Sequence, residues 1–354
     1  MGSVKDLKII LEAKGDYLGK GFFNFSDRFS VFDWGEMPNQ VPFKGAALAL
    51  MGAKSFELLE SVGINSHYNG LVENNYVRRM DELKSPSNVM SVELTRVIKP
   101  IYANGVYDYS YFKQNQGKLD NYLIPLECIY RNGLPKGSSI FKKLESGKLS
   151  LSELGFKTMP KEGDMLPKPL YDFSTKLEES GDRMIKNKDE LFAVSGLTEE
   201  EFSGLEKKIK LANELITKQC DKAGLINWDG KFEFMKYLGK IRFVDVLGTP
   251  DECRFSVGKV QVSKEVIRQW YKKIQPEWAL SIDKYKEKFN LEWKEAMIKD
   301  CLMPVPLPNT FLRLVSEMYA SCANEYCEKK FFDVPKLSEV INELKETGCA
   351  IYVA

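Results

Sequence analysis

The segment WDGKFEF contains the residue types in this sequence that are best suited to chemistry. If it forms a strand, Asp229, Lys231 and Glu233 share one face and the aromatic residues between them share the other. If residues 238–240 form a three-residue hairpin loop, Glu233 lies opposite Asp245 on the next strand. Directly paired carboxylates destabilise a sheet, but they become useful when Mg²⁺ lies between them, because Mg²⁺ takes one or two carboxylates plus phosphate oxygens and water. A solvated strand face without function is the competing interpretation, and this segment alone favours it.

Three further segments carry groups that bind anions or nucleotides. In IPLECIYRNGLPKGSS, Glu127 and Arg131 alternate along an expected strand, and a loop rich in Gly, Pro, Lys and Ser follows. Arginine offers a bidentate fork to phosphate or carboxylate, and loop hydroxyls and N–H groups can complete an anion nest. The segment STKLEESGD places Lys176 and Asp182 in an expected loop. The segment SDRFSVFD, residues 26–33, is either a substrate or nucleotide loop or a solvated strand edge.

The composition excludes several classes of function. The chain of 354 residues has 51 basic and 50 acidic residues, so no net field draws it to nucleic acid or to a membrane surface. One histidine excludes a multi-histidine metal site, and seven cysteines without a CxxC pair argue against a zinc ribbon and a disulfide framework. No run approaches the roughly 18 apolar residues of a membrane span. We therefore expect a cytoplasmic protein in which His67 and the cysteines are structural.

Strands around one helix are expected to position the first of these groups. The pattern over residues 46–62 places apolar residues on one helical face, and Gly63 follows as a C-terminal stop. Residues 100–120 are rich in Tyr, Asn and Gly and are expected to form a loop or excursion. Apolar and aromatic runs of strand length occur at residues 8–13, 21–26, 90–99 and 122–130.

The clearest helix begins in the middle of the sequence. Thr198 is a good N-cap, Glu201 completes a capping box, and Gly224 is the expected end. A Pro- and Gly-containing stretch at residues 159–169 is expected to be the connection that leads into this region. Beyond the helix we expect strands at 231–237 and 241–247, a mainly helical region from residue 263 with helices at 308–326 and 335–347, and a short strand at 350–353.

Taken together and in order, these segments resemble the SAICAR synthetase family. The matching pieces are SDRFSVFD, KG at Lys44, PLECIYRN, K-x₅-D, D-x-K-x-E-F and D-x₄-PD-x₂-R, which spans Asp245 to Arg254. The resemblance covers about residues 20 to 275, and its most specific pieces are D-x-K-x-E-F and TPD-x-x-R. A chance match of all six pieces in this order is very improbable.

The resemblance implies an α/β fold in three parts. An antiparallel sheet lobe (residues 1–123) covers ATP, a central α/β lobe (124–262) carries the metal and substrate residues, and a helical region (263–354) follows. It also implies an ATP- and Mg²⁺-dependent ligase of purine biosynthesis, which joins L-aspartate to the carboxylate of carboxyaminoimidazole ribotide after phosphoryl activation. The partners implied are these small molecules and neither nucleic acid nor membrane, and a homo-oligomer is left open.

The same resemblance implies a role for each matching residue. The catalytic group, which includes the lysine that reaches the ATP phosphates, comprises Lys176, Asp182, Asp229 and Lys231. The Mg²⁺ ligands are Glu233 and Asp245. The residues around the ribotide are Glu127, Arg131, Ser138 and Arg254, and the further substrate-binding residues are Asp27, Arg28, Lys44, Lys264 and Arg268.

One departure from the family pattern leaves other functions open. The family usually has an acidic residue where this chain has Val246. A related ATP-dependent ligase with a different acid or amine is therefore one alternative. An inositol-phosphate-type kinase shares the D-x-K core, but the proline that such kinases carry four residues before Asp229 is absent here. A nucleotide-binding regulatory protein without catalysis is the third alternative, and retention of Glu233 and Asp245 argues against it.

Overall fold

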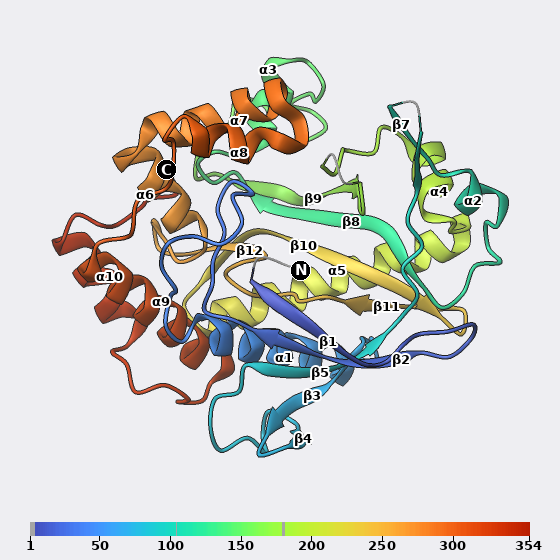
Figure 1. Cartoon of the computed structure of the whole chain (residues 1–354), viewed down its shortest axis with the longest axis horizontal. Helices are drawn as coiled ribbons and strands as arrows, with labels where there is room; N and C mark the ends of the chain where they lie inside the picture. Colours follow the sequence, from blue (N-terminus) through green and yellow to red (C-terminus); the bar gives the residue numbers. More distant parts are fainter. Residues whose placement is uncertain (1–3, 104, 179–180) are drawn as a thin grey trace.

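The computed structural model describes residues 4–103, 105–178 and 181–354, and two antiparallel sheets lie at its centre (Figure 1). The five-stranded sheet contains, in spatial order, β1 (Lys5–Leu11), β2 (Gly19–Phe25), β5 (Val89–Leu94), β3 (Tyr68–Glu73) and β4 (Tyr76–Arg78). The six-stranded sheet contains β13 (Val260–Gln261), β12 (Cys253–Val257), β10 (Ile226–Tyr237), β8 (Tyr122–Gly133) and β9 (Met165–Thr175), and β11 (Lys240–Val244) also pairs with β10.

Helices pack against both sheets and against one another. Helix α1 (Lys44–Ser61) packs on β2, β3 and β5, and α5 (Glu199–Lys222) packs on β10. Helix α9 (Asn309–Cys327) packs on α1 and on α10 (Leu337–Glu346). The other elements are β6 (Ile101–Ala103), β7 (Val106–Asp108), α2 (Ser110–Gln114), α3 (Ser139–Glu145), α4 (Lys188–Ser195), α6 (Glu265–Ile274), α7 (Pro276–Phe289), η1 (Asn290–Glu292) and α8 (Trp293–Lys299).

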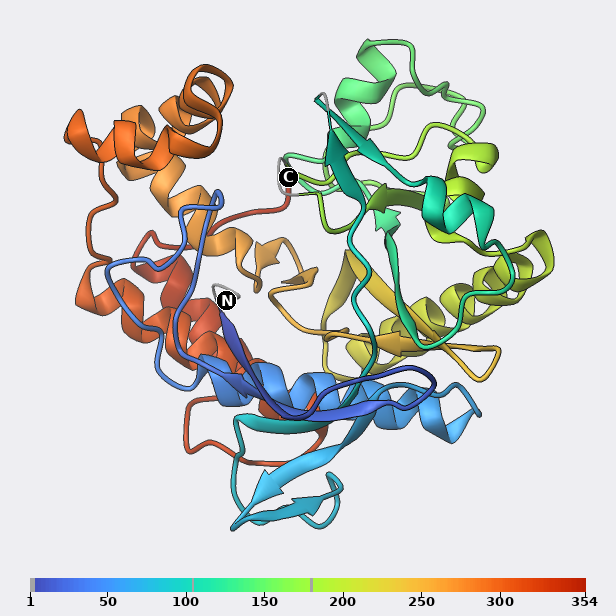
Figure 2. The same cartoon turned by 45° about the vertical axis from the view of Figure 1, so that its right-hand side comes forward.

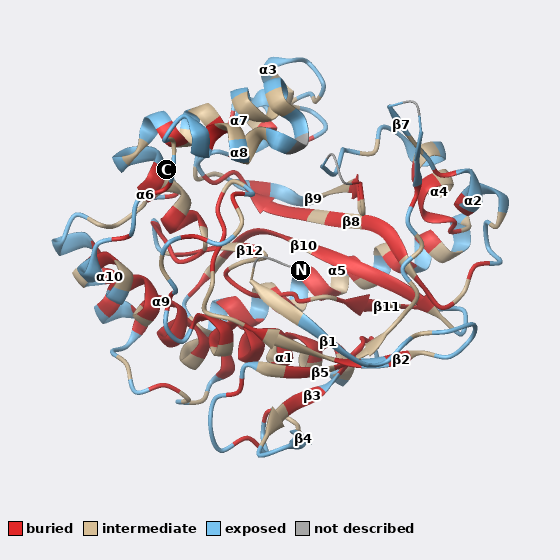
Figure 3. Ribbon diagram, viewed as in Figure 1, coloured by how far each residue is buried: buried red, intermediate tan, exposed pale blue. Residues whose placement is uncertain are grey.

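The expected mixed α/β architecture, with antiparallel sheets and C-terminal helices, is confirmed. The main cluster of buried apolar side chains runs from Phe25 to Leu344, and the strands at its centre are buried along most of their length (Figure 3). A second, smaller cluster contains Leu134, Ile140, Leu154 and Leu166. The three-part division at residues 123 and 262 stays a prediction. In the described part of the chain, no helix combines the length and apolar character that a membrane span needs.

The capping box of α5 forms as its sequence predicts. Thr198 Oγ1 accepts a hydrogen bond from Glu201 N at 3.2 Å, and Thr198 N donates to Glu201 Oε2 at 2.9 Å. Both exchanges satisfy N–H groups that the first helical turn would otherwise leave without partners. The apolar stripe of the helix, including Phe202, Leu205 and Ile209, is buried. This buried face of α5 therefore packs against β10, the strand that contains the WDGKFEF segment.

The predicted register between β10 and β11 is wrong by one residue. The connection is a two-residue turn at Leu238 and Gly239, both with positive φ (50° and 67°), so Glu233 pairs with Val244 instead of Asp245. Two-residue turns with two positive φ values match the twist of the flanking strands, which favours them over the three-residue loop that we expected. Asp245 follows the end of β11 with a φ of 62°, so strand alternation does not govern its side chain.

Four smaller expectations also differ from the structure. Residues 165–169 belong to β9 instead of a connection, and β9 can accept Pro167 and Pro169 because it is an edge strand. The strand expected at 90–99 ends at Leu94. Residues 100–120 contain the β6–β7 hairpin and α2. At 350–353 only one bridge forms, between Val260 and Tyr352.

Candidate active site

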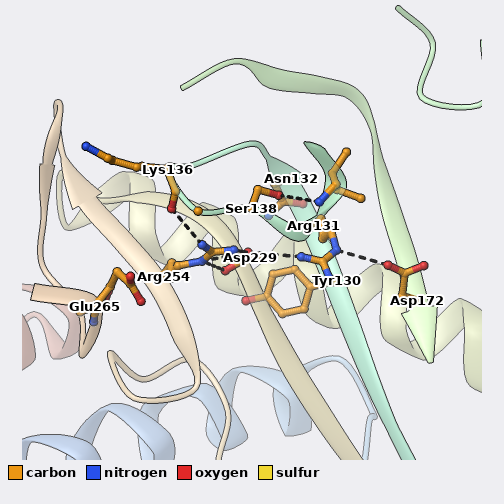
Figure 4. Close-up of polar contacts among 12 residues, drawn as sticks. Tyr130, Arg131, Asn132, Lys136, Ser138, Asp172, Asp229, Arg254 and Glu265 are labelled. Carbon is orange, nitrogen blue, oxygen red and sulfur yellow. Dashed lines mark hydrogen bonds and ion pairs between the residues drawn. The ribbon is translucent and has the colours of Figure 1, made fainter. Parts of the chain in front are cut away.

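Two arginines from different strands converge on one carboxylate. Asp229 of β10 is paired in register with Arg131 of β8 on one side and with Arg254 of β12 on the other (Figure 4). Arg254 Nε lies 2.9 Å from Asp229 Oδ1, and Arg131 Nη1 lies 3.8 Å from Asp229 Oδ2. Arg131 Nε also donates to Asp172 Oδ2 at 3.3 Å. The carboxylates therefore hold both guanidinium groups at one place, although the arginines are far apart in sequence.

The loop between β8 and α3 approaches the same place. Arg254 Nη1 donates to the backbone oxygen of Lys136 at 3.4 Å (Figure 4). Ser138 is buried, and its hydroxyl caps α3 by accepting from Ile140 N at 3.4 Å. Its neighbours Gly137 and Ser139 line the cleft, whereas Ser138 does not. The structure thus places Ser138 behind the surface that a ligand can reach.

A polar cleft of about 660 Å³ opens over these residues. Its walls come from β8, β10, β12, α6 and the SDRFSVFD loop. Besides Arg131, Asp229 and Arg254, the predicted site residues that line it are Glu127, Lys231, Lys264 and Arg268. Its other charged lining residues are Asp33, Asp251, Glu252, Glu265 and Lys272. Positive charge is therefore concentrated at two positions, the paired arginines and the exposed face of α6.

Glutamates and lysines meet between β8 and β10. Glu127 and Glu233 are directly paired across these strands. Lys176 Nζ, from the end of β9, lies 3.3 Å from Glu127 Oε2 and 2.8 Å from Glu233 Oε1. Lys231 Nζ lies 3.1 Å from both Glu127 Oε2 and Glu252 Oε2. Like charges in this position are costly without counter-ions, and the two lysines supply that compensation.

Burial and Asp245 change the protonation of Glu233. Desolvation, followed by the negative charge of Asp245, raises the pKa of Glu233 to about 7. Burial raises the pKa of Asp245, but the charges of Lys5, Lys231 and Lys176 together outweigh it, and the pKa of Asp245 falls to about 2. Burial lowers the pKa of Lys176, but the charges of Glu233 and Glu127 raise it. The pKa of Lys176 therefore lies above its usual value. A cation at Glu233 and Asp245 must therefore compete with a proton on Glu233 near neutral pH.

A second cavity, of about 540 Å³, lies on the other side of this cluster. Glu233 and Asp245 line it together with His67 and with apolar side chains from β1, β2, β5 and β10, namely Leu7, Ile9, Phe23, Leu94 and Met235. Lys231 lines the first cleft and lies 3.9 Å from Glu233, which lines the second. The carboxylate–lysine cluster therefore separates a polar cleft from a largely apolar cavity.

The lone histidine contacts the backbone beside the predicted metal ligand. His67 Nε2 lies 3.1 Å from the carbonyl oxygen of Asp245, so Nε2 carries the hydrogen because a carbonyl can only accept. Burial lowers the pKa of His67 to about 4, which leaves the ring neutral at physiological pH. A neutral ring that donates to a backbone oxygen is consistent with the structural role expected for His67.

The carboxylates that line the second cavity have the chemistry that Mg²⁺ binding requires. Within the described ranges, no group of three or more His, Cys, Asp or Glu side chains is arranged to hold a metal ion. Two hard carboxylate donors, Glu233 and Asp245, line one cavity. This number suits Mg²⁺, which usually takes one or two carboxylates and completes its octahedron with phosphate and water. Glu233 and Asp245 would hold the ion in this arrangement.

Four other predicted residues do not line either cavity. Asp27 Oδ1 accepts from Gly45 N at 2.9 Å at the start of α1, and Arg28 pairs with Asp6 at 2.8 Å. Lys44 is fully buried, and its Nζ lies 2.8 Å from Asp251 Oδ2. Asp182 is exposed in the segment after β9. Their proposed contacts with substrate stay predictions.

Several residues of the site were not predicted from the sequence. Asp251 and Glu252 lie inside the TPD-x-x-R motif, so their position beside Arg254 was an available signal. Lys272 lies two turns after Lys264 on α6 and shares its face, which helical periodicity could have indicated. Lys5 reaches Asp245 from β1, 240 positions earlier in the chain. No local pattern reveals that pairing.

The solved structures that share this fold include SAICAR synthetases. The SAICAR synthase of Saccharomyces cerevisiae, solved in complex with SAICAR, aligns with a TM-score of 0.57 at 20 % identity and covers 92 % of this chain and 96 % of its own. A SAICAR synthetase solved with ADP aligns with a TM-score of 0.52 at 24 % identity and covers 78 % of this chain and 97 % of its own. At these identities the likeness shows the fold.

Sequence comparison gives the family. The model of the SAICAR synthetase family matches residues 8–284. A protein of Archaeoglobus fulgidus, provisionally named a phosphoribosylaminoimidazole-succinocarboxamide synthase, is 45 % identical over 348 residues, which cover 98 % of this chain and 99 % of that protein. The chain belongs to the SAICAR synthetase family, whose members are ligases of purine biosynthesis.

Proposed function

We propose that the protein forms an amide between the carboxylate of carboxyaminoimidazole ribotide and the amine of L-aspartate, with ATP and Mg²⁺. The observation that carries the proposal is the arrangement of the two cavities. The carboxylate–lysine cluster lies between a polar cleft with converging arginines and an apolar cavity with two carboxylates. A transfer of a phosphoryl group from a nucleotide to a second anion needs such a meeting point.

The polar cleft suits the ribotide. Arg131 and Arg254 bind its phosphate in this proposal, since guanidinium groups form charge-assisted hydrogen bonds with phosphate oxygens. Asp229 acts as a positioning residue, because it already holds Arg254 through Nε at 2.9 and 3.1 Å. The ribotide carboxylate then points toward Lys231 and Lys176, whose ammonium groups offset its charge. The arginines thus bind the phosphate, and the lysines the carboxylate, at opposite ends of one molecule.

The second cavity suits the nucleotide. Leu7, Ile9 and Phe23 offer apolar contact to a base, and Glu233 and Asp245 would hold the Mg²⁺ that accompanies its phosphates. The ADP bound to one structural neighbour supports a nucleotide in this fold. Bound Mg²⁺ would offset phosphate charge, which is the contribution that a divalent ion makes to phosphoryl transfer.

The chemistry requires activation of the ribotide carboxylate. A carboxylate is a poor electrophile, so one of its oxygens first attacks the γ-phosphorus of ATP, and ADP leaves. The amine of L-aspartate then attacks the acyl carbon, loses a proton, and expels inorganic phosphate that retains the carboxylate oxygen. Lys176 and Lys231 neutralise charge near both steps, and no covalent bond to the protein is needed.

An isotope experiment tests this proposal. The protein is incubated with ATP, Mg²⁺, L-aspartate and ribotide whose carboxylate carries ¹⁸O, and the products are analysed by mass spectrometry. We expect one ¹⁸O in each inorganic phosphate and equal amounts of amide and ADP. A stable phosphorylated product formed without any amine is the result expected of a kinase and would contradict the proposal. Product formed with another amine but not with L-aspartate indicates the related ligase instead.

A further inference from the structure

The segment 351–353 connects two parts of the phosphate-binding end of the cleft. The chain leaves α10 and runs back to lie beside the loop that follows β8 (Figure 2). Val353 O accepts a hydrogen bond from Lys136 N at 2.7 Å, and Val353 N donates to Lys259 O at 2.9 Å. Ile351 O accepts from Gln261 N at 2.8 Å. One short segment therefore bonds to the β8–α3 loop on one side and to the β12–β13 hairpin on the other.

Both partners of this segment carry residues of the cleft. The β8–α3 loop supplies Gly137 to its wall, the first residue of α3 supplies Ser139, and β12 supplies Arg254. The two are linked directly, because Arg254 Nη1 donates to the backbone oxygen of Lys136. A displacement of Lys136 consequently moves one acceptor of the Arg254 guanidinium group, the others being the Asp229 carboxylate oxygens. The backbone of Val353 bonds to the other side of the same Lys136 residue.

Burial makes the link firm. The side chain of Val353 is only 2 % exposed, whereas Tyr352 beside it is 45 % exposed. This buried side chain anchors the Val353 backbone, whose hydrogen-bond partners Lys136 and Lys259 are themselves exposed. The first part of the loop is held separately, because Leu134 N donates to Asp164 O at 2.8 Å. The Val353 bond therefore acts on the tip of the loop, next to the cleft.

We propose that residues 351–353 are a positioning segment for phosphate binding, acting through Lys136 on Arg254. The segment touches no substrate and lies beyond residue 284, where the match to the family model ends. The identity of the anion as the ribotide phosphate rests on the proposed function. The mechanical part of the inference, the coupling from Val353 to the loop tip, rests on the hydrogen bonds alone.

A matched pair of proline variants separates this role from general support of the fold. Val353→Pro removes the N–H that bonds to Lys259. Tyr352→Pro is the control, because among the described residues the N–H of Tyr352 donates to no backbone oxygen. Val353→Gly keeps both backbone groups but loses the buried side chain, and it serves as the second variant if Val353→Pro does not fold. Thermal unfolding identifies the folded variants.

The readouts are hydrogen exchange at the Lys136 amide and calorimetric binding of three ligands without ATP. These ligands are the ribotide, its dephosphorylated riboside, and inorganic phosphate. We expect Val353→Pro to speed exchange at Lys136 and to weaken the ribotide and phosphate by about tenfold, as loss of one well-placed hydrogen bond allows. The riboside should bind as tightly as it does to the wild type. Tyr352→Pro should change none of these quantities.

Two results overturn the inference. One is a Val353→Pro protein that binds ribotide and phosphate as the wild type does. The other is an equal loss of ribotide and riboside, which indicates general damage to the cleft. A wild-type protein that binds phosphate but ignores the ribotide contradicts the proposed function alone, and the phosphate comparison between the two proline variants then still decides the role of the segment.

Discussion

Glu127 and Glu233 are paired directly across β8 and β10, and Lys176 Nζ lies between their carboxylates at 3.3 and 2.8 Å. Such a pair costs stability in a sheet unless cations compensate it. Lys231 adds a second cation 3.1 Å from Glu127. The cluster therefore places carboxylates, each beside a lysine, where Glu233 can serve as a ligand for Mg²⁺.

The first prediction concerns Glu233 and Mg²⁺. Glu233→Gln keeps the shape of the side chain but removes one charged ligand, so we expect ATP turnover to fall by about 100-fold or more at every Mg²⁺ concentration. Glu145→Gln, on the exposed end of α3, is the matched control and should retain wild-type turnover. The measurement is turnover against Mg²⁺ concentration. Equal curves for Glu233→Gln and wild type would falsify the metal assignment.

The second prediction concerns pH and the same residue. Because the pKa of Glu233 is raised from 4.5 to about 7, the folded protein binds more protons than the unfolded chain between these values. The free energy of unfolding of the wild type should therefore fall as pH rises through this window. Glu233→Gln cannot ionise, so its advantage over wild type should grow by an amount on the order of 3 kcal/mol between pH 4.5 and 8. Urea unfolding at several pH values measures this, and parallel pH curves for the two proteins contradict it.

Local signals in the sequence predict the supporting elements well. The capping box at Thr198 and Glu201 depends only on neighbouring residues, and α5 starts where they indicate. The apolar face of α5 is likewise local, and its buried residues agree with the pattern. The single apolar face expected for α1 is wrong, because residues 47–53 are buried on every side of the helix and Val62 is 45 % exposed. Phe232, 1 % exposed and stacked on Tyr130 at 4.8 Å, lies on the face opposite Glu233 as alternation predicts.

Pairings between distant residues are the part that local patterns do not determine. The turn at Leu238 and Gly239 shifts the register by one residue, because a loop of two residues and one of three fit the same sequence. The left-handed backbone of Asp245 then turns its side chain into the cavity despite the shift. The contact between Lys5 and Asp245 depends on how two sheets pack together. No spacing rule within one segment predicts it.

The third prediction concerns the converging arginines. Arg254→Met and Arg131→Met should each weaken ribotide binding by about 2 kcal/mol or more, because a charge-assisted hydrogen bond to phosphate is lost. The affinity for ADP should stay close to that of the wild type. Calorimetric titration with each ligand measures both quantities. An equal loss of ribotide and ADP affinity is the outcome that contradicts the assignment.

A control for Arg254→Met is needed because Asp229 loses its counter-ion in that variant. Asp229 is only 6 % exposed, so the unpaired carboxylate should also lower the free energy of unfolding. The double variant Asp229→Asn with Arg254→Met removes both charges and should recover part of this stability. Ribotide binding should stay weak in the double variant if Arg254 contacts the phosphate.

The fourth prediction concerns His67. Its pKa is lowered from 6.5 to about 4 by burial, so the unfolded chain binds more protons between these values and the wild type should lose stability as pH falls from 6.5 to 4. His67→Gln should lose less stability over this range. The pH–rate profile should be unchanged near neutral pH, because the proposed mechanism uses no histidine as acid or base. A loss of turnover by orders of magnitude in a folded His67→Gln protein contradicts this view.

The last prediction separates two roles for Lys44, which the sequence motif associates with substrate. Its side chain is fully buried, and Asp251, its partner at 2.8 Å, also accepts a hydrogen bond from Tyr319 at 2.7 Å. Breaking a buried ion pair by removing one partner typically costs about 3–5 kcal/mol, because the other charge stays buried without compensation. Lys44→Met should therefore lower the free energy of unfolding by about that amount. The double variant Lys44→Met with Asp251→Asn should lose less than the sum of the single variants, with a coupling energy of about 1–3 kcal/mol. Urea unfolding of all four proteins gives the cycle, and ribotide titration of Lys44→Met gives the second readout. A Lys44→Met protein with wild-type stability and strongly weakened ribotide binding would show instead that Lys44 contacts the substrate.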